Sequence, residues 1–593
     1  MSKDDKDQGS KGDLGRRDFL KFTGAAVGGA LAIGARVNAR QVTVTRRTQR
    51  KPRTPAQNFT AAALLTKFVD ALPIPGTISP SGFLGGVPFF NVNMVQFNQR
   101  LHRDLAPTRL WGYNGKYPGP TFEARRGHPI AVQWRNSLPT THFLPIDPTL
   151  HGAEPPAPQV RTVVHLHGNK VLPDSDGYPE AWFTRNFGQT GPFFENRIYN
   201  YPNDQQAATL WYHDHALGVT RLNVYAGLAG MYNLRDNVED NLNLPCGDFE
   251  IPLVIQDKFL NPDGSLLYPV QTPGDPDPNV PPIWLPEFFG DTVLVNGKVW
   301  PFLEVEPRKY RFRILNASNS RFYNLTLNQS DSHGVPNGHA GPSFFQIGSD
   351  GGFLPAPVRR NVILTAPAER FDVVIDFSDL EGKFFVLNND AKAPYPDGDD
   401  VIPEDVMLFK VKTHCSSPDH SSLPSSLAPV PLLSQSQSVR TRDLVLGEVL
   451  SAPPFENPIR GTINDALWDD PVTETPRAGS VELWRIINTT GDAHPIHIHL
   501  VQFQVLNRQP FDPDQYPGSL VFTGPPVNPP ADERPAFKDT VKSLPGEVTR
   551  LLMKFDLPTG THIHHGEKFR YVFHCHILEH EENEMMRPYD VVG

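Results

Sequence analysis

A strand-like phrase that recurs three times constrains the fold of this chain more than any other feature. Each copy alternates in character, contains an Arg and ends at an Asn: Ile130-Ala-Val-Gln-Trp-Arg-Asn136, Tyr310-Arg-Phe-Arg-Ile-Leu-Asn316 and Leu483-Trp-Arg-Ile-Ile-Asn488. The Asn residues are 180 and 172 positions apart, and a Gly or Pro turn signal precedes each copy. The near-equal spacing predicts a triplicated domain, and period-2 alternation with frequent turns predicts an antiparallel β-sandwich for each copy.

The composition agrees with several packed β domains. At about 150 residues per domain, 593 residues correspond to three or four domains. Apolar residues make up 39% of the chain and charged residues 20%, which suffices for buried cores and excludes a disordered chain. The 61 Pro and 46 Gly indicate many turns between short strands.

Charge and hydropathy exclude some partners. The formal net charge of −10 argues against nucleic acid. Beyond the N-terminus no apolar run is long enough to cross a membrane, so after signal cleavage we expect no membrane association. We also expect a monomer. Three Cys in so long a chain exclude a disulfide scaffold.

The N-terminus predicts an export signal. Arg16 and Arg17 precede an uncharged stretch at residues 22–35, and Val37-Asn38-Ala39 supplies small residues for cleavage. This layout is typical of a twin-arginine signal peptide, here residues 1–39. We therefore expect export to the periplasm or the exterior.

Four His-x-His pairs predict a metal cluster. In a strand, residues i and i+2 share a face, so each pair directs two imidazoles the same way. Imidazole suits copper, zinc, iron and nickel. Two pairs lie in the first copy and two in the third, so the ligands must meet where these copies touch. Eight imidazoles exceed one tetrahedral ion, which predicts a multinuclear site. The pairs are His165/His167, His213/His215, His497/His499 and His574/His576.

Cys575 lies between two of these histidines and predicts a second metal. It occupies the opposite strand face from its neighbours, and His580 and Met585 follow it by five and ten residues. With His494, these residues supply a thiolate, two imidazoles and a weak thioether, which is the ligand set of a blue-copper electron-transfer site. In the alternative interpretation, Cys575 and Met585 only fill the core. Met586 remains a second candidate for the thioether.

Taken together, the motifs resemble those of the multicopper oxidase family. They read His165-Leu-His-Gly168, Trp211-Tyr-His-Asp-His-Ala-Leu-Gly218, His494-Pro-Ile-His-Ile-His-Leu500 and His574-Cys-His-Ile-Leu-Glu-His580 with Met585. The sequence around these motifs is similar to that of the branch of the family that contains bacterial spore-coat laccase and bilirubin oxidase. The resemblance covers essentially the whole mature chain. It implies three cupredoxin-like Greek-key domains and four copper ions, of which one is type 1, one is type 2 and two are type 3.

The resemblance also implies a role for each ligand. Type 1 copper would be held by His494, Cys575, His580 and Met585, and type 2 copper by His165 and His497. The type 3 pair would be held by His167, His213, His215, His499, His574 and His576. His580 would face the electron donor. Asp176 and Glu581 match acidic residues that supply protons near the cluster.

The repeats and the composition divide the chain into five parts. Residues 414–438 are rich in Ser and Pro without periodicity, which is typical of a linker. A loop-rich insertion at residues 261–286 lies inside the second copy. The predicted parts are the signal peptide 1–39, domain 1 at 40–238, domain 2 at 239–413, the linker 414–438 and domain 3 at 439–593.

The predicted activity is oxidation of phenolic or tetrapyrrole donors with reduction of dioxygen to water. A phenol gives up one electron at a time whereas dioxygen takes four, so a donor-side copper must collect electrons for a cluster. One alternative is a metal-ion oxidase for cuprous or manganous ions, but the seven Met form no Met-rich run. The other is a copper-binding or structural exported protein without activity, yet all twelve expected ligands are present.

Two features stay open at this point. Cys246 and Cys415 would be able to pair in an exported protein. His562, His564 and His565 form either a further metal site or a polar loop.

Overall fold

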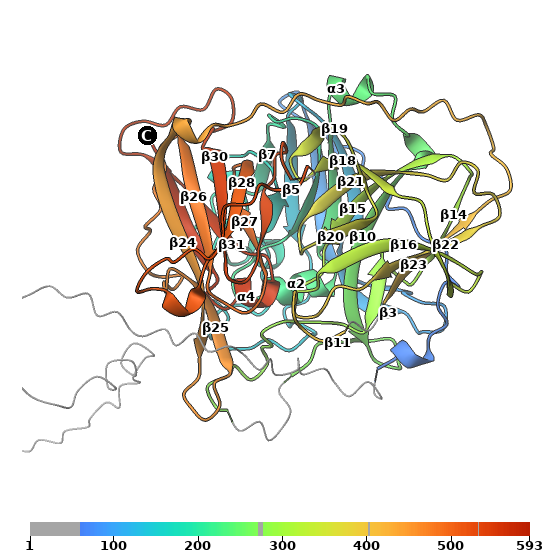
Figure 1. The fold of residues 1–593 in the computed structure, drawn as a ribbon. Helices are drawn as coiled ribbons and strands as arrows, with labels where there is room; N and C mark the ends of the chain where they lie inside the picture. Colours follow the sequence, from blue (N-terminus) through green and yellow to red (C-terminus); the bar gives the residue numbers. More distant parts are fainter. Residues whose placement is uncertain (1–59, 271–276, 401–403, 532) are drawn as a thin grey trace, which may run out of the picture. The chain divides into compact units, whose positions relative to one another are not determined.

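Within the described part of the chain, strands dominate and form six sheets, two from each of three consecutive stretches (Figure 1). The computed structural model describes residues 60–270, 277–400, 404–531 and 533–593. Strands account for 43% and helices for 6%, which confirms the all-β prediction. The predicted signal peptide lies outside the described residues.

The first group of strands spans β1 to β9. One sheet has the order β1-β2-β5-β7 with β3 paired to β2, and the other has the order β4-β9-β8-β6. Their bounds are β1 Gly82–Leu84, β2 Val87–Gln99, β3 Thr108–Tyr113, β4 Gly119–Arg125, β5 Ile130–Asn136, β6 Val164–His167, β7 Ile198–Tyr201, β8 Ala208–Asp214 and β9 Ala229–Arg235.

The second group spans β10 to β23. Its sheets have the orders β13-β12-β10-β15-β21-β18-β19, with β11 on β10, and β14-β23-β22-β16-β17, with β20 on β16. The bounds are β10 Glu250–Leu260, β11 Leu266–Leu267, β12 Thr292–Val295, β13 Lys298–Val299, β14 Phe302–Val305, β15 Lys309–Asn316, β16 Tyr323–Ser330, β17 Pro336–Ala340, β18 Phe344–Ser349, β19 Gly352–Arg360, β20 Val362–Thr365, β21 Arg370–Asp376, β22 Phe384–Asn389 and β23 Asp405–Val411.

The third group spans β24 to β32, in sheets of order β25-β24-β26-β30-β28 and β29-β27-β31-β32. The bounds are β24 Ser438–Leu450, β25 Pro458–Ile463, β26 Val481–Asn488, β27 His494–Ile498, β28 Phe503–Pro510, β29 Thr540–Ser543, β30 Glu547–Lys554, β31 Lys568–Cys575 and β32 Met586–Val592.

Helices are few and short. The α-helices are α2 Thr220–Ala226, α3 Asn237–Asp240 and α4 Leu578–Glu581. The 3-10 turns are η2 Ala62–Leu64, η3 Pro173–Ser175, η4 Arg185–Phe187, η5 Gly247–Phe249, η6 Gln435–Gln437 and η7 Pro513–Gln515. Among the described residues, none of these helices has the length and apolar character needed to span a membrane.

The recurring phrase occupies the same place in each group. It forms β5, β15 and β26, which pair in parallel with the long strands β2, β10 and β24. On their other side they pair antiparallel with β7, β21 and β30. The sequence repeat therefore corresponds to a repeated sheet topology.

The Asn that ends each phrase has a defined structural task. The Oδ1 atoms of Asn136, Asn316 and Asn488 accept hydrogen bonds from the backbone N–H two residues on, at 3.0, 3.1 and 2.9 Å. Each Nδ2 atom donates to backbone carbonyls of other segments, and all three side chains are at most 1% exposed. Asn is suited to this position because its amide both closes the turn and cross-links the strand end.

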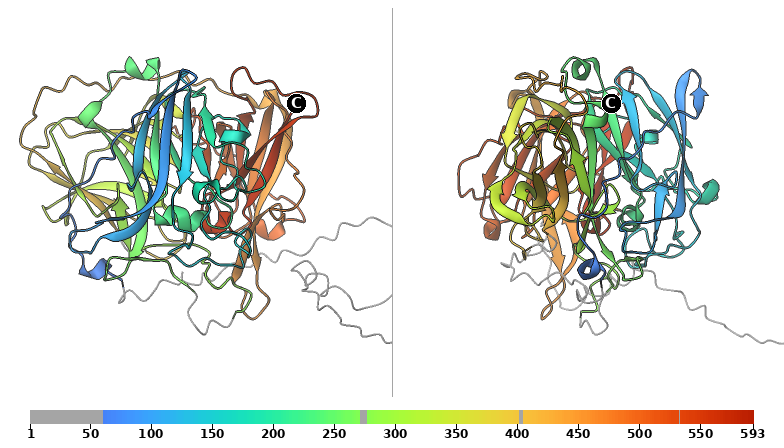
Figure 2. Two further views of the ribbon diagram at one scale, coloured as in Figure 1. Left: turned by 180° about the vertical axis from the view of Figure 1, so that it is seen from behind. Right: turned by 90° about the vertical axis from the view of Figure 1, so that its right-hand side faces the viewer.

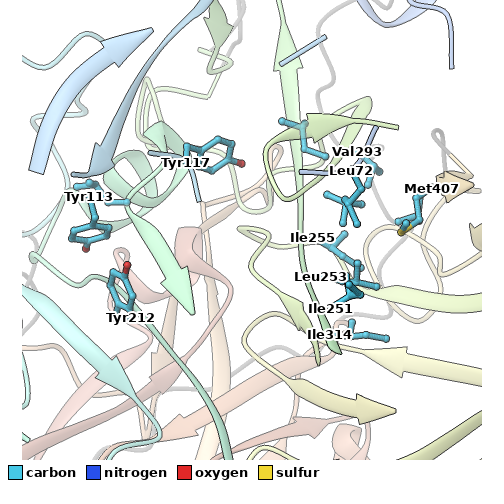
Figure 3. Close-up of a cluster of buried hydrophobic side chains, with 14 of the residues drawn as sticks. Leu72, Tyr113, Tyr117, Tyr212, Ile251, Leu253, Ile255, Val293, Ile314 and Met407 are labelled. Atoms are coloured by element: carbon cyan, nitrogen blue, oxygen red, sulfur yellow. The ribbon is translucent and has the colours of Figure 1, made fainter. Parts of the chain in front are cut away.

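Apolar side chains of β10 supply part of the largest core. Ile251, Leu253 and Ile255 point to one face of their sheet and pack near Ile314 and Met407 (Figure 3). Alternate residues of a strand share a face, so this i, i+2, i+4 pattern buries one side of β10. Met407 comes from the opposing sheet of the same group, which is the arrangement of a β-sandwich.

Figure 2 shows the three groups of strands from behind and from the side. Hydrogen bonds connect each group with the other two, and between the third and first groups Tyr571 Oη donates to Val171 O at 2.9 Å. Tyr117 Oη donates to Gln256 between the first and second groups, and Gly351 N donates to Phe537 O at 2.9 Å between the second and third. Residues 412–434 carry no helix or strand and lead from β23 to η6. The proposed domain boundaries remain a prediction.

Candidate metal centres

The four His-x-His pairs begin on two pairs of neighbouring strands, and His215, His499 and His576 each lie one residue beyond the strand end. β6 and β8 are antiparallel and place His165 opposite His213, and β27 and β31 are antiparallel and place His497 opposite His574. The second member of each pair lies two residues further along. All eight side chains are at most 1% exposed. Strand register therefore gathers two pairs on one sheet of the first group and two on one sheet of the third.

These two sheets bring their histidines together in what we call the histidine cluster. His165 Nε2 is 3.4 Å from His497 Nε2, and His215 Nε2 is 3.2 Å from His574 Nε2. Ring nitrogens lie within 4.8 Å of one another in three groups, which are His165, His167 and His497; His167, His213 and His576; and His215, His499 and His574. The meeting of the first and third groups follows the sequence prediction.

The hydrogen bonds of the rings fit a set of metal ligands. In six of the eight histidines one ring nitrogen is bonded to a protein oxygen; for example, His165 Nδ1 is 2.6 Å from Asp176 O and His497 Nδ1 is 2.8 Å from Asp539 O. Buried nitrogens of His167, His213 and His576 have no hydrogen-bond partner among the described residues. Metal-binding histidines bond one nitrogen to a protein oxygen and use the other as ligand.

Burial keeps the cluster in the protonation state that a metal requires. It lowers the pKa of His215 and of His574 from 6.5 to about 4, and it lowers the pKa of the other six imidazoles as well. The neutral imidazole is the form with a free lone pair for a metal. The site is therefore built for cations rather than for anions.

A second group of ligands surrounds Cys575, and we call it the cysteine centre. Cys575 Sγ is 3.6 Å from His494 Nδ1 and 3.7 Å from His580 Nδ1, and the two nitrogens are 3.2 Å apart. The three residues are at most 3% exposed. His494 comes from β27, Cys575 from the end of β31 and His580 from α4. A thiolate with two imidazoles is the core of a blue-copper site.

Strand alternation places the two centres on opposite faces of one sheet. Cys575 pairs with Ile496 across the sheet, on the face that also carries His494. His574 and its partner His497 lie on the other face, in the histidine cluster. Cys575 of the cysteine centre is therefore the direct sequence neighbour of His574 and His576 in the histidine cluster.

The packing distinguishes the two methionines. Met585 belongs to the same apolar cluster as Cys575, and Met585 O accepts a hydrogen bond from Cys575 N at 3.0 Å. Met586 pairs with His574 in the sheet and packs with Val572 in another cluster. Of the two thioethers, only that of Met585 lies in the apolar cluster that contains the cysteine centre.

Both predicted acidic residues contact the histidine cluster. Asp176 Oδ2 is 2.7 Å from His499 Nδ1, and burial raises the pKa of Asp176 well above its ordinary value. Glu581 Oε2 is 3.1 Å from His574 Nδ1, and burial raises the pKa of Glu581 to about 7. A carboxyl group with a pKa near 7 is suited to proton transfer at neutral pH.

Sequence reasoning missed two residues that anchor the cluster. Asp539 Oδ1 is 3.0 Å from His167 Nε2, and Arg370 Nη1 donates to the same carboxylate oxygen at 2.7 Å. Arg370 belongs to β21, so the second group contributes to the cluster although it has no His-x-His pair. Neither residue lies at a diagnostic spacing from the histidines, and no sequence signal pointed to them.

Arg370 and Asp539 belong to a buried ionic network between the second and third groups. Lys538 pairs with Asp350 at 2.8 Å, and Lys542 pairs with Glu369 at 2.6 Å. At its far end Glu533 accepts hydrogen bonds from Arg508 at 2.5 and 3.1 Å. Although burial opposes ionisation, the charges of Arg508 and Lys542 lower the pKa of Glu533 from 4.5 to about 2.

This pKa shift predicts a pH dependence of stability. A carboxyl group with a lowered folded-state pKa stabilises the fold above its unfolded pKa and loses this contribution as the pH falls. Between pH 6 and pH 3 we expect the wild type to lose about 2 kcal/mol of unfolding free energy through this group, and Glu533→Gln not to show that part. Denaturant unfolding of both proteins at the two pH values measures it. If the wild type and Glu533→Gln lost the same unfolding free energy between the two pH values, the assignment of this pH dependence to Glu533 would be contradicted.

Two features that the sequence left open are now described. Cys246 is exposed, Cys415 is half-buried, and both are free thiols. His562, His564 and His565 are exposed in the loop between β30 and β31, where Glu567 accepts a hydrogen bond from His564 N at 2.8 Å.

The two centres have the ligands expected of a cupredoxin-like, copper-dependent oxidase, and comparisons with known proteins identify that class. Two family profiles, both described as multicopper oxidase, match residues 442–592 and residues 95–158 with 157–239, which are the regions that carry the His pairs. A laccase of Bacillus subtilis is 49% identical over 535 residues, covering 89% of this chain and 99% of the relative. A laccase of Haloferax volcanii is 37% identical over 599 residues, covering 98% and 91%.

Solved structures agree with these relatives. The multicopper oxidase McoA of Aquifex aeolicus superimposes with a TM-score of 0.68 at 28% identity, covering 88% of this chain and 99% of that one. A laccase of Pediococcus acidilactici superimposes with a TM-score of 0.67 at 27% identity, covering 89% and 95%. The chain belongs to the multicopper oxidase family. It is a copper oxidoreductase that uses dioxygen as electron acceptor.

Proposed function

We propose that this protein is a laccase-type oxidase that takes single electrons from phenolic or tetrapyrrole donors at the cysteine centre and reduces dioxygen to water at the histidine cluster. The observation that carries the proposal is the position of Cys575, which lies between His574 and His576 in sequence but on the opposite face of their strand. One strand therefore connects a one-electron site with a multinuclear site.

Four copper ions would account for the donor atoms. His494, Cys575, His580 and Met585 would hold type 1 copper, and His165 with His497 would hold type 2. The type 3 pair would be held by His167, His213 and His576 on one ion and by His215, His499 and His574 on the other, as the grouping of ring nitrogens supports. When bound, these ions supply the redox chemistry, namely one-electron oxidation of donors and four-electron reduction of dioxygen.

The chain itself would supply orientation and protons. Asp176 holds His165 through its backbone oxygen and His499 through its carboxylate. Glu581 is buried, and neither carboxylate oxygen has a hydrogen-bond partner among the described residues. With its pKa near 7, Glu581 would hold a proton beside His574 and release it toward the cluster, because reduction of dioxygen to water consumes four protons.

The cellular location of the protein is also part of the proposal. The paired Arg16 and Arg17 support export by the twin-arginine route. That route carries proteins already folded, which suits a chain whose metal ligands come from distant segments. We propose a monomeric enzyme that acts in the periplasm or outside the cell.

Turnover of different donors tests the proposed activity. With fully copper-loaded protein, we expect oxygen uptake with 2,6-dimethoxyphenol and with bilirubin to exceed that with cuprous or manganous ions. The measurement is kcat/KM for each donor in an oxygen electrode. Efficient oxidation of the metal ions alone would replace the laccase-type activity with a metal-ion oxidase, and a copper-loaded protein that consumes no oxygen with any donor would exclude both.

A further inference from the structure

His167 differs from the other histidines of the cluster in the ring nitrogen that bonds the protein. Of the six histidines that bond a protein oxygen, five use Nδ1, whereas His167 uses Nε2, which donates to Asp539 Oδ1 at 3.0 Å. Thr540 Oγ1 lies 3.1 Å from the same nitrogen. His167 Nδ1 has no hydrogen-bond partner among the described residues, so it is the nitrogen that remains for a metal.

Arg370 fixes the carboxylate that receives this bond. Its Nη1 donates to Asp539 Oδ1 at 2.7 Å, and its Nη2 donates to Asp539 Oδ2. A contact with two parallel hydrogen bonds fixes the plane of the carboxylate as well as its position. The side chains of Arg370 and Asp539 are 0% exposed, so solvent does not compete for these bonds.

The other hydrogen bonds of Arg370 hold the first and second groups of strands. Its Nε donates to Thr209 O of β8 at 3.0 Å. Its Nη1 also donates to Ala368 O at 2.8 Å, and its Nη2 also donates to Asp350 O at 3.3 Å. All five N–H groups of the guanidinium are therefore used. One side chain of β21 thus contacts all three groups of strands beside the cluster.

The residue that follows His167 leaves space for this contact. Gly168 has a φ of +87°, and a Cβ atom there would lie 2.5 Å from Asp539 Oδ2 and 2.8 Å from Arg370 Nη2. Glycine is suited to this position because it adopts a positive φ without strain and lets other groups approach the backbone closely. The first group of strands is therefore shaped to receive the pair of Arg370 and Asp539.

We propose that Arg370 is a positioning residue of the histidine cluster: through Asp539 it fixes the His167 ring with Nδ1, rather than Nε2, directed toward a metal. The proposal rests on the proposed function, because it takes His167 as a ligand of the type 3 pair. The second group of strands, to which the proposed function assigns no copper ligand, thereby controls how tightly that pair is bound.

The experiment compares Arg370→Lys, Asp539→Ala and the double variant with the wild type. Each protein is loaded with copper and dialysed against increasing concentrations of a chelator, and the remaining copper is quantified. Lysine keeps the buried positive charge but lacks the planar fork of donors. Asp539→Ala removes the partner of His167 Nε2 and keeps the backbone oxygen that bonds His497.

We expect the chelator to remove copper from the cluster at concentrations about 10- to 100-fold lower in each variant than in the wild type. The visible band of the cysteine centre should persist, which also shows that the variant has folded. An EPR spectrum supplies a second readout. A coupled pair of cupric ions gives no signal, so the cluster copper of the variants should gain one as the pair is disrupted.

The double variant tests whether Arg370 acts through Asp539. If it does, Arg370→Lys should cause no further loss of copper once Asp539 is alanine, because the effects of residues that act as one unit are not additive. Arg442→Lys is the matched control. Arg442 pairs with Glu482 at 2.6 and 3.0 Å in another buried contact, and neither residue belongs to the histidine cluster. This control should retain copper and EPR signal as the wild type does.

Wild-type retention of copper in Arg370→Lys, additive losses in the double variant, or an equal loss in Arg442→Lys would each overturn the proposal. If Asp539→Ala does not fold, Arg370→Lys and its control decide the question. A wild type that binds copper at the cysteine centre alone would instead refute the proposed function.

Discussion

Cys575→Ser is expected to abolish the visible absorption of the copper-loaded protein and to reduce oxidation of organic donors by well over 100-fold. Removal of outer-sphere partners of a metal site already costs about 10- to 100-fold in affinity or activity. Cys575 is more than such a partner, because its Sγ lies 3.6 and 3.7 Å from two imidazoles and it supplies the thiol of that metal-binding group. A serine hydroxyl is a poor substitute for a thiolate as a ligand for this kind of copper site.

The measurement is an absorption spectrum with copper quantification, followed by kcat/KM for a phenol. Cys246→Ser is the matched control, because Cys246 is exposed and lies outside both centres. It should retain colour and activity. A Cys575→Ser protein that folds, binds the same amount of copper and oxidises phenols at the wild-type rate would contradict the account.

His213→Ala is expected to separate the two centres. His213 is on β8 in the first group, whereas Cys575 is on β31 in the third, so the substitution removes an imidazole from the cluster and leaves the cysteine centre in place. We expect the visible band to persist and a phenol to bleach it once in the absence of oxygen. Oxygen uptake should fall by more than about 100-fold.

The measurement combines anaerobic reduction of the visible band with steady-state oxygen uptake. His128→Ala, at a position outside the histidine cluster, is the control and should resemble the wild type in both. Loss of the visible band in His213→Ala together with oxygen uptake would show that the centres do not fold and bind independently, and undiminished oxygen uptake would contradict the assignment of His213 to the cluster.

Local patterns predicted much of the fold. The recurring phrase is informative because strand alternation and the Asn at its end both have local causes, and the structure repeats β5, β15 and β26 in one topological position. The four His-x-His pairs are informative for the same reason, since two residues apart in a strand means one shared face. Such signals are contained within a few residues.

The contacts between distant segments could not be predicted from the sequence. Asp539 contacts His167, Arg370 contacts Asp539, and Glu287 contacts His580. These three residues come from separate segments, and no spacing relates them to the histidines. Which group of strands packs against which decides these contacts. The choice between Met585 and Met586 had a similar cause, because it depends on which of the two side chains packs in the apolar cluster of Cys575. Spacing along the chain does not determine that direction.

An anaerobic reductive titration of protein with quantified copper tests the central claim most directly. The account predicts about four copper ions per chain and four electron equivalents taken up, with the visible band and the remaining copper both reduced by a donor that acts at the cysteine centre. Uptake of a single electron equivalent with bleaching of the visible band, while the remaining copper stays oxidised, would contradict the claim that the two centres are connected.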